Sequence, residues 1–289
     1  MSTAKSPRTV KGAARLAGHE VHQATKNPWI KALTRYGYFA RGVVFATIGF
    51  LALALAAGKP GTLTDQNGAL VTLAAQPFGR ILLIAIVVGL SGFALWGFIR
   101  AIFDPLGRGN DKKGIIERIG FLTSGISYSA LVAPFMQVIL SGRRAASMSQ
   151  SKTTQDIAGR ILAMPFGPWL VGLIGLLVIG WGLGQVRVSY TASFKKDFEA
   201  SKMNAVQEKW MIRLGRVGIS TRGLVYTLMG FFFLQAALRA DPKQAIGLDG
   251  ALQVLANQPG AALLLVVAAI GLIVFGFYSV LCALWIEVD

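Results

Sequence analysis

Arginines recur at a fixed spacing in this chain, and their guanidinium groups are well suited to binding anions. Three of them stand two residues before a glycine, and in two of these segments a second arginine follows six residues later. The set is Arg35, Arg41, Arg118, Arg216 and Arg222. A cation at the amino end of a helix opposes the helix dipole, so the first arginine of each segment should have an anionic partner. We expect a lipid headgroup or a protein carboxylate in that role.

A simpler interpretation of the arginines stays open, because basic residues at the ends of membrane helices commonly act as topology signals without a ligand. Asp104, Glu117 and Glu208 lie on the same predicted side of the membrane and are the candidate carboxylate partners. Trp29 and Trp210 each stand six residues before the first arginine of their segment. Tryptophan anchors helices at membrane interfaces, so this pair favours a collar of aromatic and basic side chains that meets anionic lipid.

Few residues are suited to catalysis or to holding a metal ion. His19 and His22 are the only histidines and lie in a basic tail, and Cys282 is the only cysteine. A single cysteine excludes an internal disulfide, a cysteine zinc site and an iron–sulfur cluster. No glycine-rich phosphate loop follows a predicted strand. We therefore expect no enzymatic activity, no cofactor and no bound metal.

Composition indicates a membrane protein. Of the 289 residues, 54% are hydrophobic and only 15% are charged, which is too apolar for a protein surrounded by water. Six uncharged runs reach or approach the length of about 20 residues that spans a bilayer. They cover residues 42–58, 81–99, 119–142, 161–186, 223–238 and 261–286. We predict an all-α polytopic fold with six transmembrane helices. Arg41 and Arg222, at the starts of the two shortest runs, should extend toward the headgroups.

The distribution of charge predicts the orientation. The net charge is +16, and most basic residues fall within 1–41, 100–118 and 187–222. Short loops rich in lysine and arginine stay in the cytoplasm, so both termini should be cytoplasmic in a multi-pass protein of the inner (cytoplasmic) membrane. The basic tail, residues 1–31, favours an anionic lipid surface over nucleic acid, because a membrane anchor follows it directly.

The arginine segments belong to an internal repeat. Residues 35–45, 118–128 and 216–226 align with an arginine, two glycines and an aromatic residue at the same spacing. Three two-helix units follow, at 32–104, 114–190 and 205–287. Each unit crosses the membrane an even number of times, so all three should insert the same way up. A pseudo-threefold axis along the membrane normal should then relate them.

The Arg-x-Gly-x-x-x-Arg-Gly start with its following aromatic residue, and the Ala-Leu…Gln-Pro-x-Gly loop, resemble the bacterial membrane family known as domain of unknown function 1206. The resemblance extends from Arg35 to about Glu287. The second repeat departs from it, because Ser124 replaces the second arginine. The resemblance implies the repeated fold and a membrane location, and it supplies no substrate.

Small and polar residues inside the predicted spans indicate how the helices meet. Glycines seven residues apart share a helix face and let a neighbouring helix approach closely in lipid. The predicted packing glycines are Gly42, Gly49, Gly125, Gly223 and Gly230. Gln137 and Gln235 are equivalent positions of repeats two and three. They either hydrogen-bond neighbouring helices or line a solvated path.

We expect a non-catalytic scaffold, or a module that interacts with lipids and with a membrane-protein partner. The alternative is a small passive channel or transporter with a path along the pseudo-threefold axis. Between the arginine-marked helix starts and Glu287, the predicted spans contain no Asp, Glu, His or Lys. Proton-coupled carriers usually need such groups at depth, so proton coupling is disfavoured. A polar cavity between the repeats would favour the channel, and close glycine packing would favour the scaffold.

Overall fold

The computed structural model of the protein describes residues 28–57, 66–105, 109, 111–141, 150–198, 203–257 and 262–286. Every named element in these ranges is a helix, so the all-α prediction is confirmed for them. Phe198 and Ile286 form an isolated β-bridge. Residues 1–27 of the basic tail and the side chain of Gln137 lie outside the described residues.

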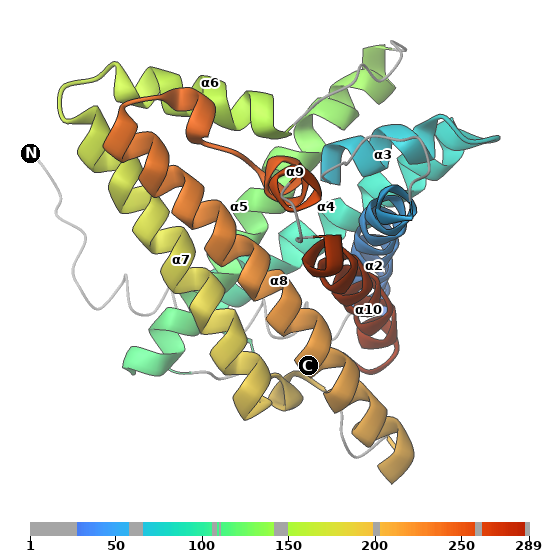
Figure 1. Ribbon diagram of the computed structural model, residues 1–289. Coiled ribbons are helices and arrows are strands. Elements are labelled where there is room, and N and C mark those ends of the chain that lie inside the picture. Colours follow the sequence, from blue (N-terminus) through green and yellow to red (C-terminus); the bar gives the residue numbers. More distant parts are fainter. Residues whose placement is uncertain are drawn as a thin grey trace, which may run out of the picture.

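The helices follow a pattern of long, short and long in three successive units. The first unit holds α2 (Pro28–Ala56), α3 (Gln66–Ala74) and α4 (Gly79–Phe103), the second α5 (Lys112–Ser141), α6 (Gln150–Leu162) and α7 (Gly167–Thr191), and the third α8 (Ala205–Arg239), α9 (Leu248–Asn257) and α10 (Ala262–Trp285). Two short helices, η1 (Ser193–Asp197) and η3 (Pro242–Gln244), follow α7 and α8. Figure 1 shows α3, α6 and α9 at one end of the bundle, opposite to the chain's C-terminus.

Among the described residues, five helices are long and apolar enough to cross a membrane. They are α2 from Lys31 onward, α4, α7, α8 and α10. The chain is thus a multi-pass membrane protein by the length and composition of its helices, and α5 is not among the five. The run predicted from residue 161 is divided differently from the prediction. Ile161 belongs to α6, and the long helix α7 begins only at Gly167.

A left-handed turn introduces both α4 and α7. Phe78 and Phe166 precede these helices with φ of 61° and 62°. Each is followed by a glycine, Gly79 or Gly167, whose added Cβ would overlap the backbone at the end of the short helix before it. The repeated Pro-Phe-Gly sequence therefore folds the short helix back onto the long one in both units, because only glycine fits at that contact.

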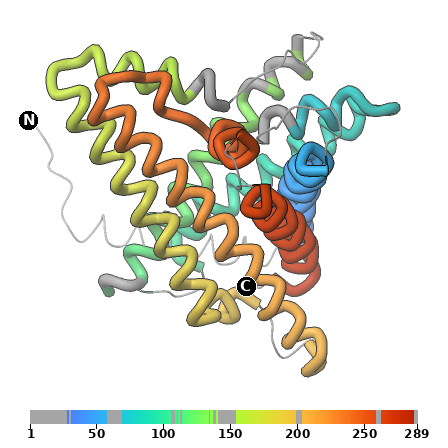
Figure 2. The backbone as a smooth tube through the Cα atoms, in the orientation of Figure 1, coloured from blue at the N-terminus to red at the C-terminus, as the bar shows by residue number. Residues whose placement is uncertain are grey.

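Packing between units is more extensive than packing within them. The last helix of each unit packs along the first helix of the next: α4 on α5, α7 on α8, and α10 on α2. The last contact joins the third unit to the first, as the red and blue helices of Figure 2 show. Within units, α2 packs on α4 and α8 packs on α10. Among the described residues, α5 and α7 have no comparable interface.

Glycines stand where two of these pairs cross. A Cβ added at Gly42 of α2 would lie 2.6 Å from the carbonyl oxygen of Gly276 on α10. A Cβ at Gly223 of α8 would lie 2.6 Å from the carbonyl oxygen of Gly182 on α7. Both distances are shorter than real carbon–oxygen contacts, so the backbones approach as closely as glycine alone permits.

The other predicted packing glycines lie at the same interfaces or at their counterpart. Gly49 faces the carbonyl oxygen of Ala269 on α10, and Gly230 faces that of Gly175 on α7. Gly125 of α5 faces the carbonyl oxygen of Ala94 on α4, where an added Cβ would lie 3.1 Å away. Each unit-to-unit crossing therefore has a glycine from the first helix of the unit against the backbone of the preceding helix.

Candidate functional site: arginines at the helix crossings

Arg41 lies near the middle of α2 and is enclosed by aromatic rings. Its guanidinium carbon is 4.7 Å from the ring centre of Tyr38, 4.6 Å from that of Phe93 and 5.2 Å from that of Phe275. Its Nε and Nη2 donate hydrogen bonds to Ser279 Oγ on α10, at 3.2 and 3.1 Å. The residue is only 8% exposed. Arg41 therefore joins α2 of the first unit to α10 of the third.

The prediction that Arg41 extends to the headgroups stays a prediction, and the structure encloses its side chain among neighbouring helices. The helix begins at Pro28, so Arg41 stands about 20 Å along it rather than at its start. Inserting an arginine at the centre of a membrane helix costs about 3 kcal/mol. A desolvated cation–π contact contributes about 2 kcal/mol. The three rings and the serine together offset the cost of burial, which the sequence around Arg41 did not reveal.

Arg222 occupies the equivalent position on α8 and contacts a different set of groups. Its Nη2 donates a short hydrogen bond to Gln185 Oε1 on α7. Its guanidinium carbon lies 4.4 Å from the ring centre of Phe275 and 5.8 Å from that of Tyr226. The residue is partly buried, and its Nε is shielded from solvent without a hydrogen-bond acceptor. Arg222 is therefore less fully satisfied than Arg41.

One ring, Phe275, lies against both guanidiniums. Neither Arg41 nor Arg222 has a carboxylate within ion-pair distance in the described part of the chain, in contrast to Arg100, Lys195 and Lys196. Two positive charges therefore share an aromatic core, where the described residues offset them with neutral oxygen atoms and ring faces. Such an arrangement would attract an anion more strongly than an exposed arginine does, because screening by water is weak inside a protein.

A third buried arginine, Arg100, does have a carboxylate partner. It ends the uncharged part of α4 and is 4% exposed. Its Nη2 lies 2.7 Å from Asp197 Oδ1 in η1, and its guanidinium carbon is 3.6 Å from the ring centre of Phe121 on α5. The sequence placed Arg100 among the loop charges. Two features of the sequence could have indicated this pair. Arg100 stands directly after an uncharged run, and Asp197 stands between two lysines and a phenylalanine.

Three consecutive residues of η1 bind three different helices. Lys195 pairs with Glu208 of α8 at 3.2 Å, Lys196 pairs with Glu117 of α5, and Asp197 pairs with Arg100 of α4. Glu117 and Glu208, two candidate partners for the arginines, thus have lysine partners. The third candidate, Asp104, accepts a hydrogen bond from the backbone N–H of Gly109 at 2.8 Å.

The residues of the predicted interfacial collar lie apart from this core. Trp29 is 80% exposed and Trp210 is 55% exposed, and Arg216 is exposed as well. Arg35 is partly buried. Arg118 donates from Nε and Nη2 to the carbonyl oxygens of Ala101 and Ile102, at 2.8 and 3.0 Å. It therefore caps the carboxyl end of α4, where a cation also complements the helix dipole.

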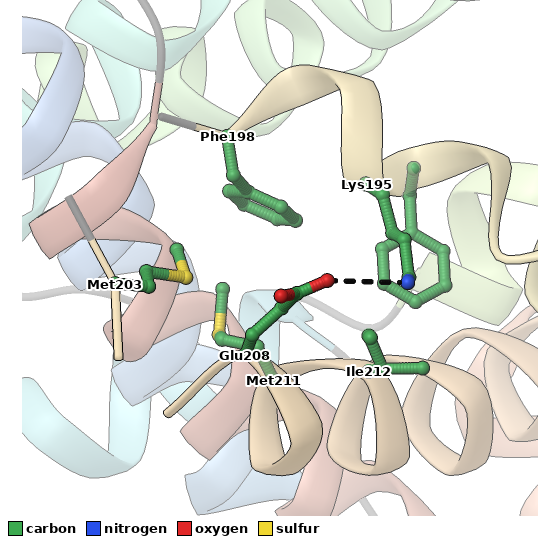
Figure 3. Close-up of a pocket in the computed structure, with 7 residues that line it drawn as sticks. Lys195, Phe198, Met203, Glu208, Met211 and Ile212 are labelled. Carbon is green, nitrogen blue, oxygen red and sulfur yellow. Dashed lines mark hydrogen bonds and ion pairs between the residues drawn. The ribbon is translucent and has the colours of Figure 1, made fainter. Parts of the chain in front are cut away.

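Two surface hollows lie away from the arginine core. The first, about 260 Å³, lies between η1 and α8, and Figure 3 shows Lys195 and Glu208 paired across it. The second, about 460 Å³, is lined by apolar residues of α6, α7 and α8. Neither includes Gln235, which is partly buried in α8. The described residues contain no cluster of three His, Cys, Asp or Glu side chains that could hold a metal.

The three units coincide with a known repeat. The family model described as Domain of Unknown Function (DUF1206) matches residues 36–104, 119–192 and 217–285. The chain belongs to this family. It is 38% identical over 262 residues to "Uncharacterized protein YxxB" of Bacillus subtilis (strain 168), a match that covers 91% of this chain and 93% of that protein. No solved structure matches the chain. Each DUF1206 match begins within the first helix of a unit and ends at the final residue of the unit's last helix or one residue beyond it.

Proposed function

We propose that the protein is a non-catalytic scaffold of the cytoplasmic membrane that binds anionic lipid at its cytoplasmic face and presents the bundle to a membrane-protein partner. In this proposal α5 is the sixth span, both termini are cytoplasmic, and the three units follow a pseudo-threefold order. The observation that carries the proposal is the way in which the units are joined. Glycine crossings and buried arginines join each unit to the next.

Close packing between the units supports a scaffold over a conduit. The ring of Phe93 meets those of Tyr38 and Tyr128 edge-on, with centres 4.9 and 4.8 Å apart. Phe45 and Phe275 meet in the same way, 4.8 Å apart. These rings come from helices of all three units, in the region that a central path would have to cross. Amide and hydroxyl groups nearby, such as those of Gln185 and Ser279, bond to arginines across helix pairs.

The proposal that α5 is the sixth span rests on the length of this helix and on the helix against which it packs. The helix has 30 residues, enough to cross the hydrocarbon core. It packs along α4, which is itself one of the five apolar candidates. Serines and a threonine lower its hydropathy, and helices with such residues are stable in membranes when neighbouring helices shield them.

Cysteine labelling in intact cells would test the orientation. Cys282 is buried, so the native chain should give little background. Under the proposal, Arg239→Cys reacts with an impermeant maleimide added outside, and Lys196→Cys reacts only after the cells are opened. Both positions are exposed, which makes them a matched pair. The opposite result at either position would refute the proposed orientation.

Replacing the collar arginines would test the lipid role. In the variant Arg35→Gln, Arg118→Gln, Arg216→Gln we expect the protein purified in mild detergent to retain less anionic phospholipid, measured by native mass spectrometry. The control removes three cations from the opposite face, with Arg160→Gln, Arg239→Gln, Lys243→Gln, and should retain as much as the parent. Equal retention by both variants would contradict the lipid proposal.

A passive conduit for an anionic solute is the second candidate. The observation that favours it is Arg222, which is partly exposed and has a shielded Nε without an acceptor. Proteoliposomes that show chloride or phosphate efflux above that of empty liposomes, with the flux abolished by Arg222→Gln, would support a conduit. Efflux equal to that of empty liposomes would leave the scaffold as the better proposal.

A further inference from the structure

The charge balance of the aromatic core sets two of the buried arginines apart from the third. Arg100 is paired with Asp197, whereas Arg41 and Arg222 meet no carboxylate among the described residues. Both of the latter lie against Phe275, so the two charges are close enough to repel one another. A bound anion would reduce this repulsion, and an anion between two guanidiniums is a common solution in proteins.

Arg222 has N–H donors to spare. A guanidinium has five N–H donors, and in Arg222 the one hydrogen bond goes to Gln185. Its Nε is shielded from solvent and has no acceptor, as is also true of the Nε of Arg35 and of Arg100, and this is costly for a buried donor. Arg222 as a whole is still partly exposed, so a ligand could reach it. Arg41, by contrast, is almost fully enclosed and uses two donors on Ser279.

The surroundings of Arg222 fit an oxyanion better than a simple halide. The planar guanidinium presents parallel N–H groups that match two oxygen atoms of a phosphate or carboxylate. Tyr128 of α5 packs edge-on against Phe93, which itself lies against Arg41, so its ring belongs to the same aromatic core. Together Arg41 and Arg222 supply two charges and several N–H donors from α2 and α8.

We propose that Arg222, with Arg41 as a second positive charge, binds a phosphate-type oxyanion inside the helix bundle. The oxyanion is either the phosphodiester of a lipid or free phosphate. Arg222 stands six residues beyond Arg216 on α8, which is about 9 Å deeper along the helix. The site is therefore distinct from the interfacial collar, and it stands whether or not the collar binds lipid.

The test uses the full-length protein and a matched pair of variants. Arg222→Gln removes the internal charge, and Arg239→Gln removes an exposed charge from the same helix, outside the collar. In the first arm, protein stripped of lipid in detergent is heated in rising concentrations of sodium phosphate, with sodium chloride at equal ionic strength as the reference. In the second arm, protein purified without stripping is weighed by native mass spectrometry to detect a retained phospholipid.

We expect phosphate to raise the unfolding temperature of the parent and of Arg239→Gln, but not that of Arg222→Gln, if the ligand is free phosphate. If it is a lipid, a retained phospholipid should be present in the parent and in Arg239→Gln and missing from Arg222→Gln. The proposal is overturned if Arg222→Gln matches the parent in both arms, or if Arg239→Gln shows the same loss.

A conservative variant covers the case in which Arg222→Gln fails to fold. Arg222→Lys keeps the charge and loses the parallel N–H groups. We expect it to need about tenfold more phosphate for half of the maximal stabilisation, or to retain proportionally less lipid, because one charged hydrogen bond is lost. An unchanged requirement in Arg222→Lys would count against binding at this guanidinium.

Discussion

The crossing of α7 with α8 and the crossing of α4 with α5 share a backbone arrangement and differ in their charges. In the first, Gly223 meets the carbonyl oxygen of Gly182, and Arg222 bonds to Gln185, three residues further along α7. The crossing of α10 with α2 repeats this plan with Arg41 and Ser279. In all three crossings a glycine from the first helix of one unit lies against the backbone of the last helix of the adjoining unit: α2 against α10, α5 against α4, and α8 against α7.

In the crossing of α4 with α5, both members of the polar pair are missing. Ser124 stands where the other units have arginine, and Gly97 stands where they have the acceptor. The buried arginine of this crossing comes from the opposite helix: Arg100 of α4 lies over Phe121 of α5 and pairs with Asp197. The α4–α5 crossing thus lacks both the arginine and its acceptor. Either residue alone would leave a polar group without a hydrogen-bond partner in the membrane.

This comparison indicates that the repeated feature is the close approach of the helices, and that each crossing stabilises its buried cation differently. Two cations rely on neutral acceptors and rings, and one relies on an ion pair.

The ion pair at the α4–α5 crossing should have the largest single effect. Asp197→Asn leaves Arg100 buried without a counter-charge, so we expect a loss of about 3 kcal/mol in the free energy of unfolding. Denaturation in mixed SDS micelles would measure it. The control is Glu208→Gln, which breaks the exposed pair with Lys195 and should cost less than about 1 kcal/mol. Equal losses for the two variants would mean that the burial of Arg100 contributes nothing.

Two glycine substitutions on α7 should change the free energy of unfolding in opposite directions. Gly182→Ala places a methyl group against the backbone of Gly223 and should destabilise the protein by about 2–3 kcal/mol. Gly180→Ala, two residues earlier, meets nothing within 4 Å and should stabilise α7 by up to about 1 kcal/mol through helix propensity. Unfolding measured as above distinguishes them, and a loss at position 180 would contradict the packing described here.

The neutral acceptor of the α7–α8 crossing should have an intermediate effect. Gln185→Leu leaves Arg222 without its hydrogen bond, and we expect a loss of about 2 kcal/mol in the free energy of unfolding. Adding Arg222→Leu should restore part of the loss, since both polar groups are then removed. A double-mutant cycle on the same assay measures the coupling. Additive losses would show that the two side chains act independently.

The smallest effect on the free energy of unfolding should come from Asp241, which lies between α8 and η3, and it should depend on pH. The backbone N–H of Lys243, and then the side chain of Gln244, lower the pKa of Asp241 below its usual value. A lowered folded-state pKa means that the stabilisation is complete above the unfolded pKa of about 3.9 and is lost as pH falls through the folded pKa. Asp241→Asn should therefore unfold slightly earlier than the parent at pH 7, and the difference should shrink as the pH falls below about 3.9. A difference that stays constant as the pH falls through the acid range would exclude this origin.

The sequence alone predicted much of the local structure. Long uncharged runs predict spans because a lipid environment requires continuous apolar helix, and repeated Arg-Gly segments predict that the units resemble one another. The uncharged runs did not reveal the short helix α6 before α7, or the short helix α9 between η3 and α10. Those helices are amphipathic and have 13 and 10 residues, so they are too short or too charged to be found as uncharged runs that span a bilayer.

The candidate site was predictable only in part. Arg41 and Arg222 stand out in the sequence, yet the sequence does not show that rings and neighbouring helices surround them, because an arginine beside a short apolar run is expected to snorkel. Ser279 lies 238 residues from Arg41, and no local pattern connects them. Arg100 was missed because its partner comes from a different unit.

The order of helices, the repeated glycine spacing and the absence of residues suited to metal chemistry are properties of the sequence by itself, since each depends on neighbours along the chain. Only the tertiary structure determines that the units are joined mainly to one another, that Phe275 lies against two arginines, and that η1 pairs with three helices. These contacts depend on how the backbones cross, and a buried charge is stable only where the fold brings distant rings and acceptors around it.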